Sequence, residues 1–266
     1  MKKLIFIIYL MFSSQIALAQ ITVVVPYSVG GAFDSMARKF AKFVETKMNE
    51  QVTIENVAGA GGLIGLKRIL SIPNSIAITS NSIYHMAKDN QLTLSDYQQI
   101  SLLAENPYFL TVAETSGLTC ELLKNKNKNY FIGTSGPNSA SSFPAEMVIE
   151  KHSNFTEVPY KGQSQALIDL FGKNIHTVFV TGESALRPDI VLLANTSNHT
   201  FRGIPSWSKC LGIDKKYMGQ FLMITRSSSD AVFVYKMKKL TDDFVKDLET
   251  IEYFKTNGFT HSVNLK

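Results

Sequence analysis

Three turns rich in glycine and serine are the part of the sequence best suited to hold a ligand. They span residues 27–31, 59–65 and 133–139, and each follows a predicted strand and precedes a predicted helix. In an open parallel sheet such turns gather outside the carboxyl ends of the strands. The helix N-termini there present unpaired N–H groups and a partial positive charge, while Gly30 and Gly31 let backbone amides approach without obstruction by Cβ. This arrangement favours binding of an anion such as a carboxylate.

Two of these turns resemble cofactor or catalytic motifs, but each lacks a required residue. The turn 59–65 fails the dinucleotide-binding pattern because Ile64 stands where the third glycine is needed. The turn 133–139 departs from the nucleophile elbow at Pro137, and no histidine and acid can be paired with its serines. The five histidines and two cysteines show no metal-ligand spacing. We therefore expect no metal, no cofactor and no enzymatic activity.

The elements that must position these turns alternate between strands and helices. Apolar and β-branched runs predict strands at 21–26, 52–55, 76–79, 108–112, 130–132, 156–159, 176–180, 191–194 and 221–225. Apolar residues at helical spacing predict helices at 33–48, 63–70, 145–151, 164–171 and 240–255. The alternation indicates an α/β fold with mostly parallel sheets and right-handed crossovers. Because no flexible linker is visible, two α/β lobes that share crossing segments suit the pattern best.

The first nineteen residues predict a secretory signal peptide. A basic start is followed by the apolar run 4–12 and by the small residues Ala17 and Ala19, after which cleavage is expected. The alternative is a membrane anchor, but the apolar run is shorter than the roughly 20 residues that a bilayer core requires. The mature protein is therefore expected in the periplasm.

The charge content limits the classes of partner, and the cysteine content bears on whether a disulfide forms. The net charge of +5 includes Lys2 and Lys3 of the predicted signal peptide and is spread evenly, which argues against a nucleic-acid partner. Cys120 and Cys210 lie ninety positions apart and could pair in an oxidising compartment or remain unpaired and buried. The sequence does not supply the Cα separation that decides between these alternatives, and we slightly favour unpaired thiols.

Four motifs in order resemble those of the tripartite tricarboxylate transporter receptors, also called the Bug family. They are a valine-rich strand with a Gly-Gly turn, Asp and Ala-Arg at 23–38, Glu-Asn-x-x-Gly-Ala-Gly-Gly-x-x-Gly at 55–65, the turn 133–139, and Val-Pro-Tyr-Lys-Gly at 158–162. The resemblance continues more faintly at 184–186 and 203–205. It implies a two-lobed periplasmic-binding-protein-like α/β fold, each lobe a mostly parallel sheet flanked by helices. Residues 20–105, completed by 219–266, would form lobe 1, and residues 106–218 lobe 2.

The resemblance also implies a site in the cleft between the lobes. Its residues would be Tyr27, Ser28, Gly30, Gly31 and Asp34 on one wall, Ser135, Gly136 and Ser139 on the other, and Ser80, Asn81, Tyr160, Lys161 and Gly162 along the cleft. Two of these residues have a second interpretation. Asp34 could instead stabilise the first turn of its helix, and Lys161 could be a surface lysine.

The function that the resemblance implies is a monomeric receptor that captures a small organic carboxylate for a tripartite membrane permease. Delivery to a sensor kinase is an alternative output, and a secreted hydrolase using Ser135 or Ser139 is a remote one. This sequence departs from the family pattern at Val29, where proline is usual, and at Asn138, where glycine is usual. It also ends soon after the predicted helix 240–255, whereas family members continue into a further helix.

Overall fold

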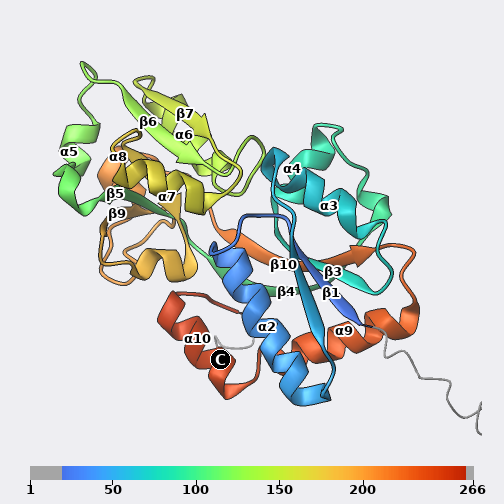
Figure 1. Ribbon diagram of the computed structural model, residues 1–266. Coiled ribbons are helices and arrows are strands. Elements are labelled where there is room, and N and C mark those ends of the chain that lie inside the picture. Colours follow the sequence, from blue (N-terminus) through green and yellow to red (C-terminus); the bar gives the residue numbers. More distant parts are fainter. Residues whose placement is uncertain (1–19, 262–266) are drawn as a thin grey trace, which may run out of the picture.

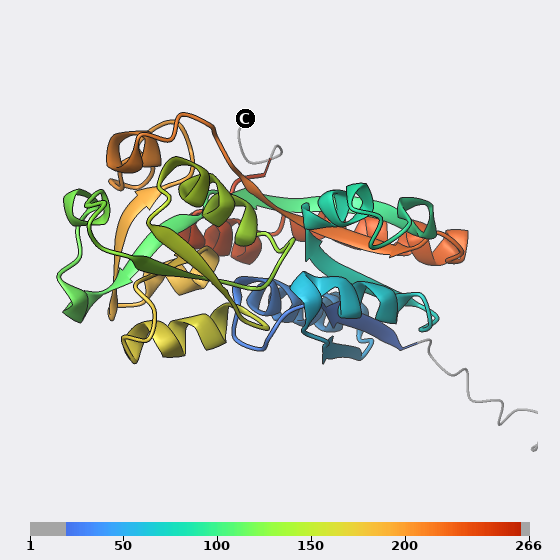
Figure 2. The same ribbon diagram turned by 90° about the horizontal axis from the view of Figure 1, so that it is seen from above.

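A computed structural model describes residues 20–261 and shows two α/β lobes side by side (Figures 1 and 2). The predicted signal peptide, residues 1–19 with cleavage after Ala19, lies outside the described residues. Between residues 20 and 261, no helix is long and apolar enough to cross a membrane. Each lobe contains one five-stranded sheet, and we number the lobes by the order in which the chain begins their sheets.

The sheet of lobe 1 has the strand order β2-β1-β3-β10-β4. Its strands are β1 (Ile21–Val25), β2 (Val52–Asn56), β3 (Ser75–Ser80), β4 (Tyr97–Asn106) and β10 (Gly219–Arg226). β1 pairs in parallel with β2 and β3, whereas β10 runs antiparallel to both β3 and β4. Four strands therefore share one direction, and the first predicted turn leaves the carboxyl end of β1, an inner strand of the sheet.

The sheet of lobe 2 repeats this pattern in the order β7-β6-β8-β5-β9. Its strands are β5 (Phe109–Ala113), β6 (Tyr130–Thr134), β7 (Phe155–Pro159), β8 (Thr177–Val180) and β9 (Ile190–Asn195). β6 pairs in parallel with β7 and β8, and β5 is antiparallel to β8 and β9. The expectation of two mostly parallel sheets is confirmed, with one antiparallel strand in each.

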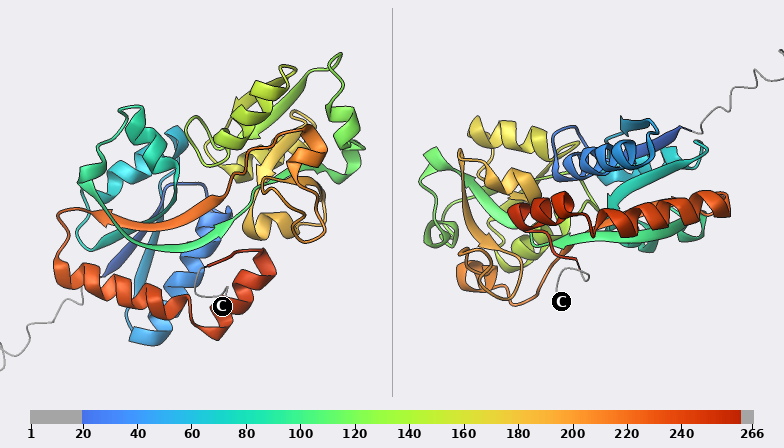
Figure 3. Two further views of the ribbon diagram at one scale, coloured as in Figure 1. Left: turned by 180° about the vertical axis from the view of Figure 1, so that it is seen from behind. Right: turned by 90° about the horizontal axis from the view of Figure 1, so that it is seen from below.

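The chain crosses between the lobes twice, once from β4 into β5 and once on the way to β10. The two crossings lie next to each other, because Asn106 at the end of β4 pairs with Gly219 at the start of β10. The view from behind shows them running together between the lobes (Figure 3). The sheets are thus joined by two adjacent strands, a connection about which two lobes can rotate.

Helices cover the sheets and bury one apolar face each. They are α2 (Ala32–Met48), α3 (Leu63–Ile69), α4 (Ser82–Lys88), α5 (Cys120–Leu123), α6 (Ser142–Lys151), α7 (Gln163–Phe171), α8 (Trp207–Leu211), α9 (Ala231–Phe244) and α10 (Leu248–Asn257), with short 3-10 turns such as η1 (Ala60–Gly62) and η4 (Gly182–Leu186) between them. In α2 the buried Phe33, Met36, Phe40 and Val44 follow the predicted 3.6-residue spacing. This packing fixes the N-terminus of α2 at the edge facing lobe 2.

Two expectations about secondary structure are corrected. The single helix expected at 240–255 is instead two, α9 and α10, because the Asp247 carboxylate accepts a bond from the Thr250 backbone N–H at 3.0 Å and starts a new helix. A second C-terminal helix is therefore present. The strand β4 was not predicted. Only four of its ten residues, 97–106, are buried, and they do not alternate regularly with exposed ones.

The expectation of unpaired cysteines is wrong, because Cys120 and Cys210 form a disulfide. Cys120 begins α5 and Cys210 lies in α8, and these two helices pack against each other with the cysteine Cα atoms 5.2 Å apart. That separation lies within the range a disulfide requires. The bond ties together two parts of lobe 2 that are 90 positions apart in the chain.

Candidate ligand-binding site between the lobes

A small cavity lies where the N-terminus of α2 in lobe 1 faces the N-termini of α6 and α7 in lobe 2. Residues from both lobes line it: Tyr27, Ser28, Gly31, Ala32, Phe33, Tyr108, Ser135, Ala140, Ser141 and Gln163. It leaves about 20 Å³ for the centres of water molecules. This is room for one or two waters, so the two lobes fit closely together around the cavity.

The wall formed by lobe 1 is the predicted turn after β1 and the start of α2. Gly31 is the N-cap of α2, and within the described chain no side chain caps this end. The first N–H groups of the helix therefore face the cavity without an intrahelical partner. Tyr27 is buried beside them, with its hydroxyl 3.0 Å from Ser80 Oγ and its ring centroid 4.6 Å from that of Phe33.

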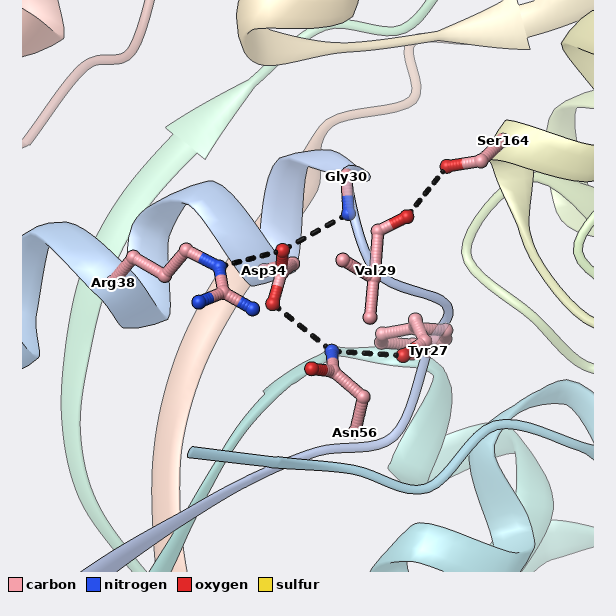
Figure 4. A network of polar contacts seen from close by, with 7 residues as sticks. All are labelled: Tyr27, Val29, Gly30, Asp34, Arg38, Asn56 and Ser164. Atoms are coloured by element: carbon pink, nitrogen blue, oxygen red, sulfur yellow. Dashed lines mark hydrogen bonds and ion pairs between the residues drawn. The ribbon is translucent and has the colours of Figure 1, made fainter. Parts of the chain in front are cut away.

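Asp34 is not among the residues that line the cavity, and it holds this turn in place (Figure 4). Its Oδ2 accepts bonds from the Gly30 N–H and the Arg38 Nε, each at 2.9 Å, and its Oδ1 accepts one from Asn56 Nδ2 at 3.0 Å. The same Asn56 amide donates to the Tyr27 carbonyl at 3.2 Å. Burial alone would raise the pKa of Asp34, but the bonds from Arg38, Gly30 and Asn56 outweigh it, so the pKa is lowered.

The wall formed by lobe 2 is the turn after β6 and the start of α6. The Ser135 N–H donates to Ser141 Oγ at 2.9 Å, and Ser141 Oγ also lies 3.2 Å from Ser139 Oγ. Hydroxyl groups thus hold this turn, and Ser141 is the N-cap of α6. Asn138 has φ +58°, the left-handed conformation that glycine adopts readily and that asparagine tolerates best among other residues. Asparagine at this position therefore adopts the backbone conformation that glycine would adopt.

The electrostatic field in the cavity comes from backbone and hydroxyl groups. Among the described residues that line it, none is Lys, Arg, His, Asp or Glu. Two buried polar atoms there, Ser28 Oγ and Gln163 Nε2, have no hydrogen-bond partner within residues 20–261. Because a buried polar atom without a partner costs about 1–3 kcal/mol, these atoms favour a polar molecule in the cavity. Burial also raises the pKa of Tyr108, which keeps this phenol neutral.

The structure brings together only part of the predicted site. Tyr27, Ser28, Gly31 and Ser135 line the cavity. Behind them, and absent from the lining, are Ser80, Asp34 and Ser139, each of which supports a lining group through the bonds described above. Gly30, Gly136 and Gly162 lie where the two lobes meet beside the cavity.

Three predicted residues lie away from the cavity. Lys161 is exposed, with its backbone N–H bonded to Gln165 Oε1 at 3.0 Å, as the surface interpretation expected. The Tyr160 hydroxyl points to Asp169 Oδ2 at 2.7 Å. Asn81 is the N-cap residue of α4 and is not among the lining residues.

Sequence reasoning missed six lining residues: Ala32, Phe33, Tyr108, Ala140, Ser141 and Gln163. Gln163 could have been found, because it directly follows the Val-Pro-Tyr-Lys-Gly motif and begins α7. Ser141 directly precedes α6, and a serine before that helix would have indicated it. Tyr108 carries no such signal, since only the crossing between the lobes brings it to the cavity.

A second hollow lies on lobe 2 alone. It is lined by Met147, Glu150, Lys151, Gly212, Ile213, Asp214 and Lys215, and holds about 440 Å³. Its charged groups, such as Lys215 and Glu150 with Nζ and Oε2 3.7 Å apart, are exposed. Exposed ion pairs are well solvated and contribute little. The cavity between the lobes is therefore the better candidate site.

Solved structures resemble this chain over almost its whole length. BugD, a periplasmic binding protein, superposes with a TM-score of 0.84 at 21% identity, covering 92% of this chain and 89% of that one. MatC from Rhodopseudomonas palustris, solved with malate, gives 0.79 at 16% identity and 94% coverage of both chains. An R. palustris protein solved with adipate gives 0.79 at 21% identity, covering 90% of this chain and 87% of that one. These similarities show the fold.

Sequence comparison identifies the family. An Agrobacterium vitis protein of the UPF0065 group is 25% identical over 171 residues, which are 58% of this chain and about half (49%) of that protein. BugT of Bordetella pertussis is 22% identical over 264 residues, covering 90% of this chain and 80% of BugT. The model of the tripartite tricarboxylate transporter family receptor matches residues 36–190, more than half of the chain. The chain therefore belongs to the tripartite tricarboxylate transporter receptor family.

Proposed function

We propose that this protein is a periplasmic receptor that binds a small organic carboxylate between its lobes and delivers it to a membrane permease. The observation that carries the proposal is the cavity where the N-termini of α2 and α6 face each other from opposite lobes. Two helix N-termini supply N–H donors and partial positive charge for an anion. Malate and adipate in the two R. palustris neighbours support a carboxylate as the ligand class.

The cavity suits recognition of a carboxylate by neutral donors. Each charge-assisted bond from a buried N–H or hydroxyl to a carboxylate contributes about 1.5–3 kcal/mol. Ser28 Oγ and Gln163 Nε2 add two donors whose hydrogen-bonding capacity is unused. Phe33 and Tyr108 supply an apolar surface against which the carbon skeleton of the ligand would pack.

Release and delivery follow from the connection between the lobes. The lobes would open about the paired crossings at Asn106 and Gly219, which supports the boundaries 20–105 with 219–266 for lobe 1 and 106–218 for lobe 2. Closing around a ligand presents one joint surface of both lobes to a permease. The expected receptor is a monomer that acts without catalysis, a cofactor or a metal.

Isothermal titration of protein that has been unfolded and refolded to remove bound ligand tests the proposal. The panel contains malate, adipate and citrate, together with the uncharged diamides of malate and adipate. We expect one-to-one binding of at least one carboxylate and no binding of its diamide, because the helix N-termini select negative charge. Folded protein that binds every diamide as well as its acid would contradict the proposal.

A pair of glutamine variants on the same helix locates the binding. Gln163→Ala removes a donor in the cavity, whereas Gln165→Ala removes an exposed side chain two residues further on. We expect Gln163→Ala to weaken binding about tenfold, the loss of roughly one hydrogen bond to a charged group. Gln165→Ala should leave the affinity unchanged. Equal effects of the two variants would place the ligand elsewhere.

A further inference from the structure

We infer that the glycine-rich loop 59–62 is a latch surface on which lobe 2 closes, and that Gly61 sets how far the lobes can close. This inference concerns closure and rests on the proposed function only for its link to ligand affinity. It accounts for Gly61 within the Gly-Ala-Gly-Gly sequence, which resembled a dinucleotide-binding motif but lacked its third glycine. The loop contacts protein backbone from the other lobe.

The backbone of lobe 2 occupies the space that a side chain at Gly61 would need. A Cβ there would lie 2.1 Å from the Pro137 carbonyl oxygen and 3.2 Å from the Ser139 backbone nitrogen. From the other side, a Cβ at Gly136 would lie 3.3 Å from the Gly61 backbone nitrogen. Two glycine-containing loops thus meet backbone to backbone across the lobes, a closeness that any side chain at Gly61 would prevent.

Two more contacts close the lobes beside the same cavity. A Cβ at Gly162, in lobe 2, would lie 2.0 Å from Ser28 Oγ and 2.7 Å from Ser28 Cβ in lobe 1. Next to it the Ser164 hydroxyl donates to the Val29 carbonyl at 2.9 Å, the contact drawn in Figure 4. Together with the loop 59–62, these contacts form what we call the latch: Gly61 against Pro137, Gly162 against Ser28, and the Ser164 hydrogen bond.

A methyl group at Gly61 would keep the lobes apart. Cβ contacts below 3.0 Å do not occur in real proteins, so the 2.1 Å approach to a rigid carbonyl must lengthen by about 1 Å. A ligand held from both lobes would then lose contacts from one of them. Because apparent affinity scales with the fraction of protein able to close, the variant should bind more weakly.

The chain offers a matched control for this substitution. Gly61 and Gly117 have nearly the same left-handed backbone, with φ of +66° and +65°. Alanine costs the same backbone strain at both positions. A Cβ at Gly117 meets nothing within 4 Å among the described residues, whereas the Cβ at Gly61 meets the other lobe. The difference between Gly61→Ala and Gly117→Ala therefore isolates the contact between the lobes.

The experiment measures lobe separation and affinity in these two variants. Spin labels on the exposed Lys88 of lobe 1 and Glu150 of lobe 2, each replaced by cysteine, report the separation by pulsed electron paramagnetic resonance. Titration with the carboxylate that binds the wild type best reports the affinity. We expect Gly61→Ala to shift the closed distance outward and to lower affinity at least tenfold, with Gly117→Ala unchanged in both. Identical distances in the two variants would overturn the inference.

The outcomes separate the latch from the proposed function. If no carboxylate binds the wild type, the proposed function fails, while the distance between the labels still tests the latch in ligand-free protein. If Gly61→Ala does not fold, Gly162→Ala takes its place, because φ at Gly162 is 177° and alanine there adds no backbone strain. We expect it to widen the distance between the labels as well. An unchanged distance in Gly162→Ala would then contradict the inference.

Discussion

The two lobes build the same kind of turn with different chemistry. In lobe 1 a buried carboxylate, Asp34, holds the turn together by accepting hydrogen bonds from a backbone amide, a guanidinium and a side-chain amide. In lobe 2 the turn is held by hydroxyl groups, with Ser141 Oγ accepting from the Ser135 N–H. Both arrangements leave a helix N-terminus facing the cavity. Placing a helix N-terminus at the cavity therefore does not require one particular set of supporting side chains.

The difference predicts that the lobes respond to different conditions. Lobe 1 depends on an ionised group, so acid should loosen its turn. Lobe 2 depends on neutral hydroxyls and on the disulfide between Cys120 and Cys210, so a reductant should affect it most. Four predictions, in order of decreasing effect, test this contrast.

Removing the disulfide should give the largest effect. Cys120→Ser frees a 90-residue loop in the unfolded chain, which the chain-entropy model values at about 4–5 kcal/mol. Urea unfolding followed by tyrosine and tryptophan fluorescence measures this loss, with the sole tryptophan, Trp207, reporting on lobe 2. Cys210→Ser and the double variant should show the same loss, because each removes the same bond. A loss of stability in the double variant equal to the sum of the two single losses would contradict this explanation.

Replacing the carboxylate that holds the lobe 1 turn should come second. Asp34→Asn keeps the shape but removes the charge that strengthens the bonds from Arg38 and Gly30, and we expect a loss of about 2–3 kcal/mol. Asp189→Asn in lobe 2 is the control, since its pair with Arg187 is 42–44% exposed and should contribute less than about 1 kcal/mol. Equal losses in the two variants would show that the Asp34 network is no stronger than a surface ion pair.

The same carboxylate predicts how stability changes with pH. The pKa of Asp34 is lowered from 3.8, so the unfolded chain takes up its proton at a higher pH than the folded protein does. Its contribution is then fully present above the unfolded pKa and is lost as the pH falls through the folded one. Urea midpoints from pH 7 to pH 3 should converge for wild type and Asp34→Asn. A difference that stays constant down to pH 3 would contradict the lowered pKa.

The hydroxyl support of lobe 2 should give the smallest effect. Ser141→Ala leaves the Ser135 N–H without its acceptor, and we expect a loss of about 1 kcal/mol that does not vary between pH 7 and pH 3. Ser208→Ala in α8 removes a hydroxyl of the same lobe that donates to the side chain of the exposed Asp214, and it should cost less. A loss in Ser141→Ala that varies with pH would contradict the predicted difference in pH dependence between the two lobes.

Much of the fold could be predicted from the sequence because its strands are short apolar runs. The buried runs that became β1, β3, β6 and β8 stand out by hydrophobicity alone. The strand β4 does not, because it lies at the sheet edge and six of its residues, 97–106, are half-buried or exposed. The break between α9 and α10 rests on one capping residue, Asp247, within a continuous helical pattern. Local patterns therefore predict buried strands better than they predict edge strands or breaks between helices.

The candidate site was predictable where it lies within one turn. Tyr27, Ser28, Gly31 and Ser135 belong to glycine- or serine-rich turns, and the structure places them around the cavity. Tyr108 reaches the cavity only because the chain crosses between the lobes there. The pairing of Cys120 with Cys210 likewise depends on how two separate helices pack. Distances between segments far apart in sequence are set by the whole fold, and no local spacing encodes them.

A crystal structure of the protein with a bound carboxylate tests the central claim most directly. The account predicts that the carboxylate oxygens lie within hydrogen-bond distance of backbone N–H groups at the N-termini of both α2 and α6. It also predicts that Ser28 Oγ and Gln163 Nε2 donate to the ligand or to a water that bridges to it. A ligand held in the hollow of lobe 2 beside Met147, or by the side chain of Lys161, would contradict the account.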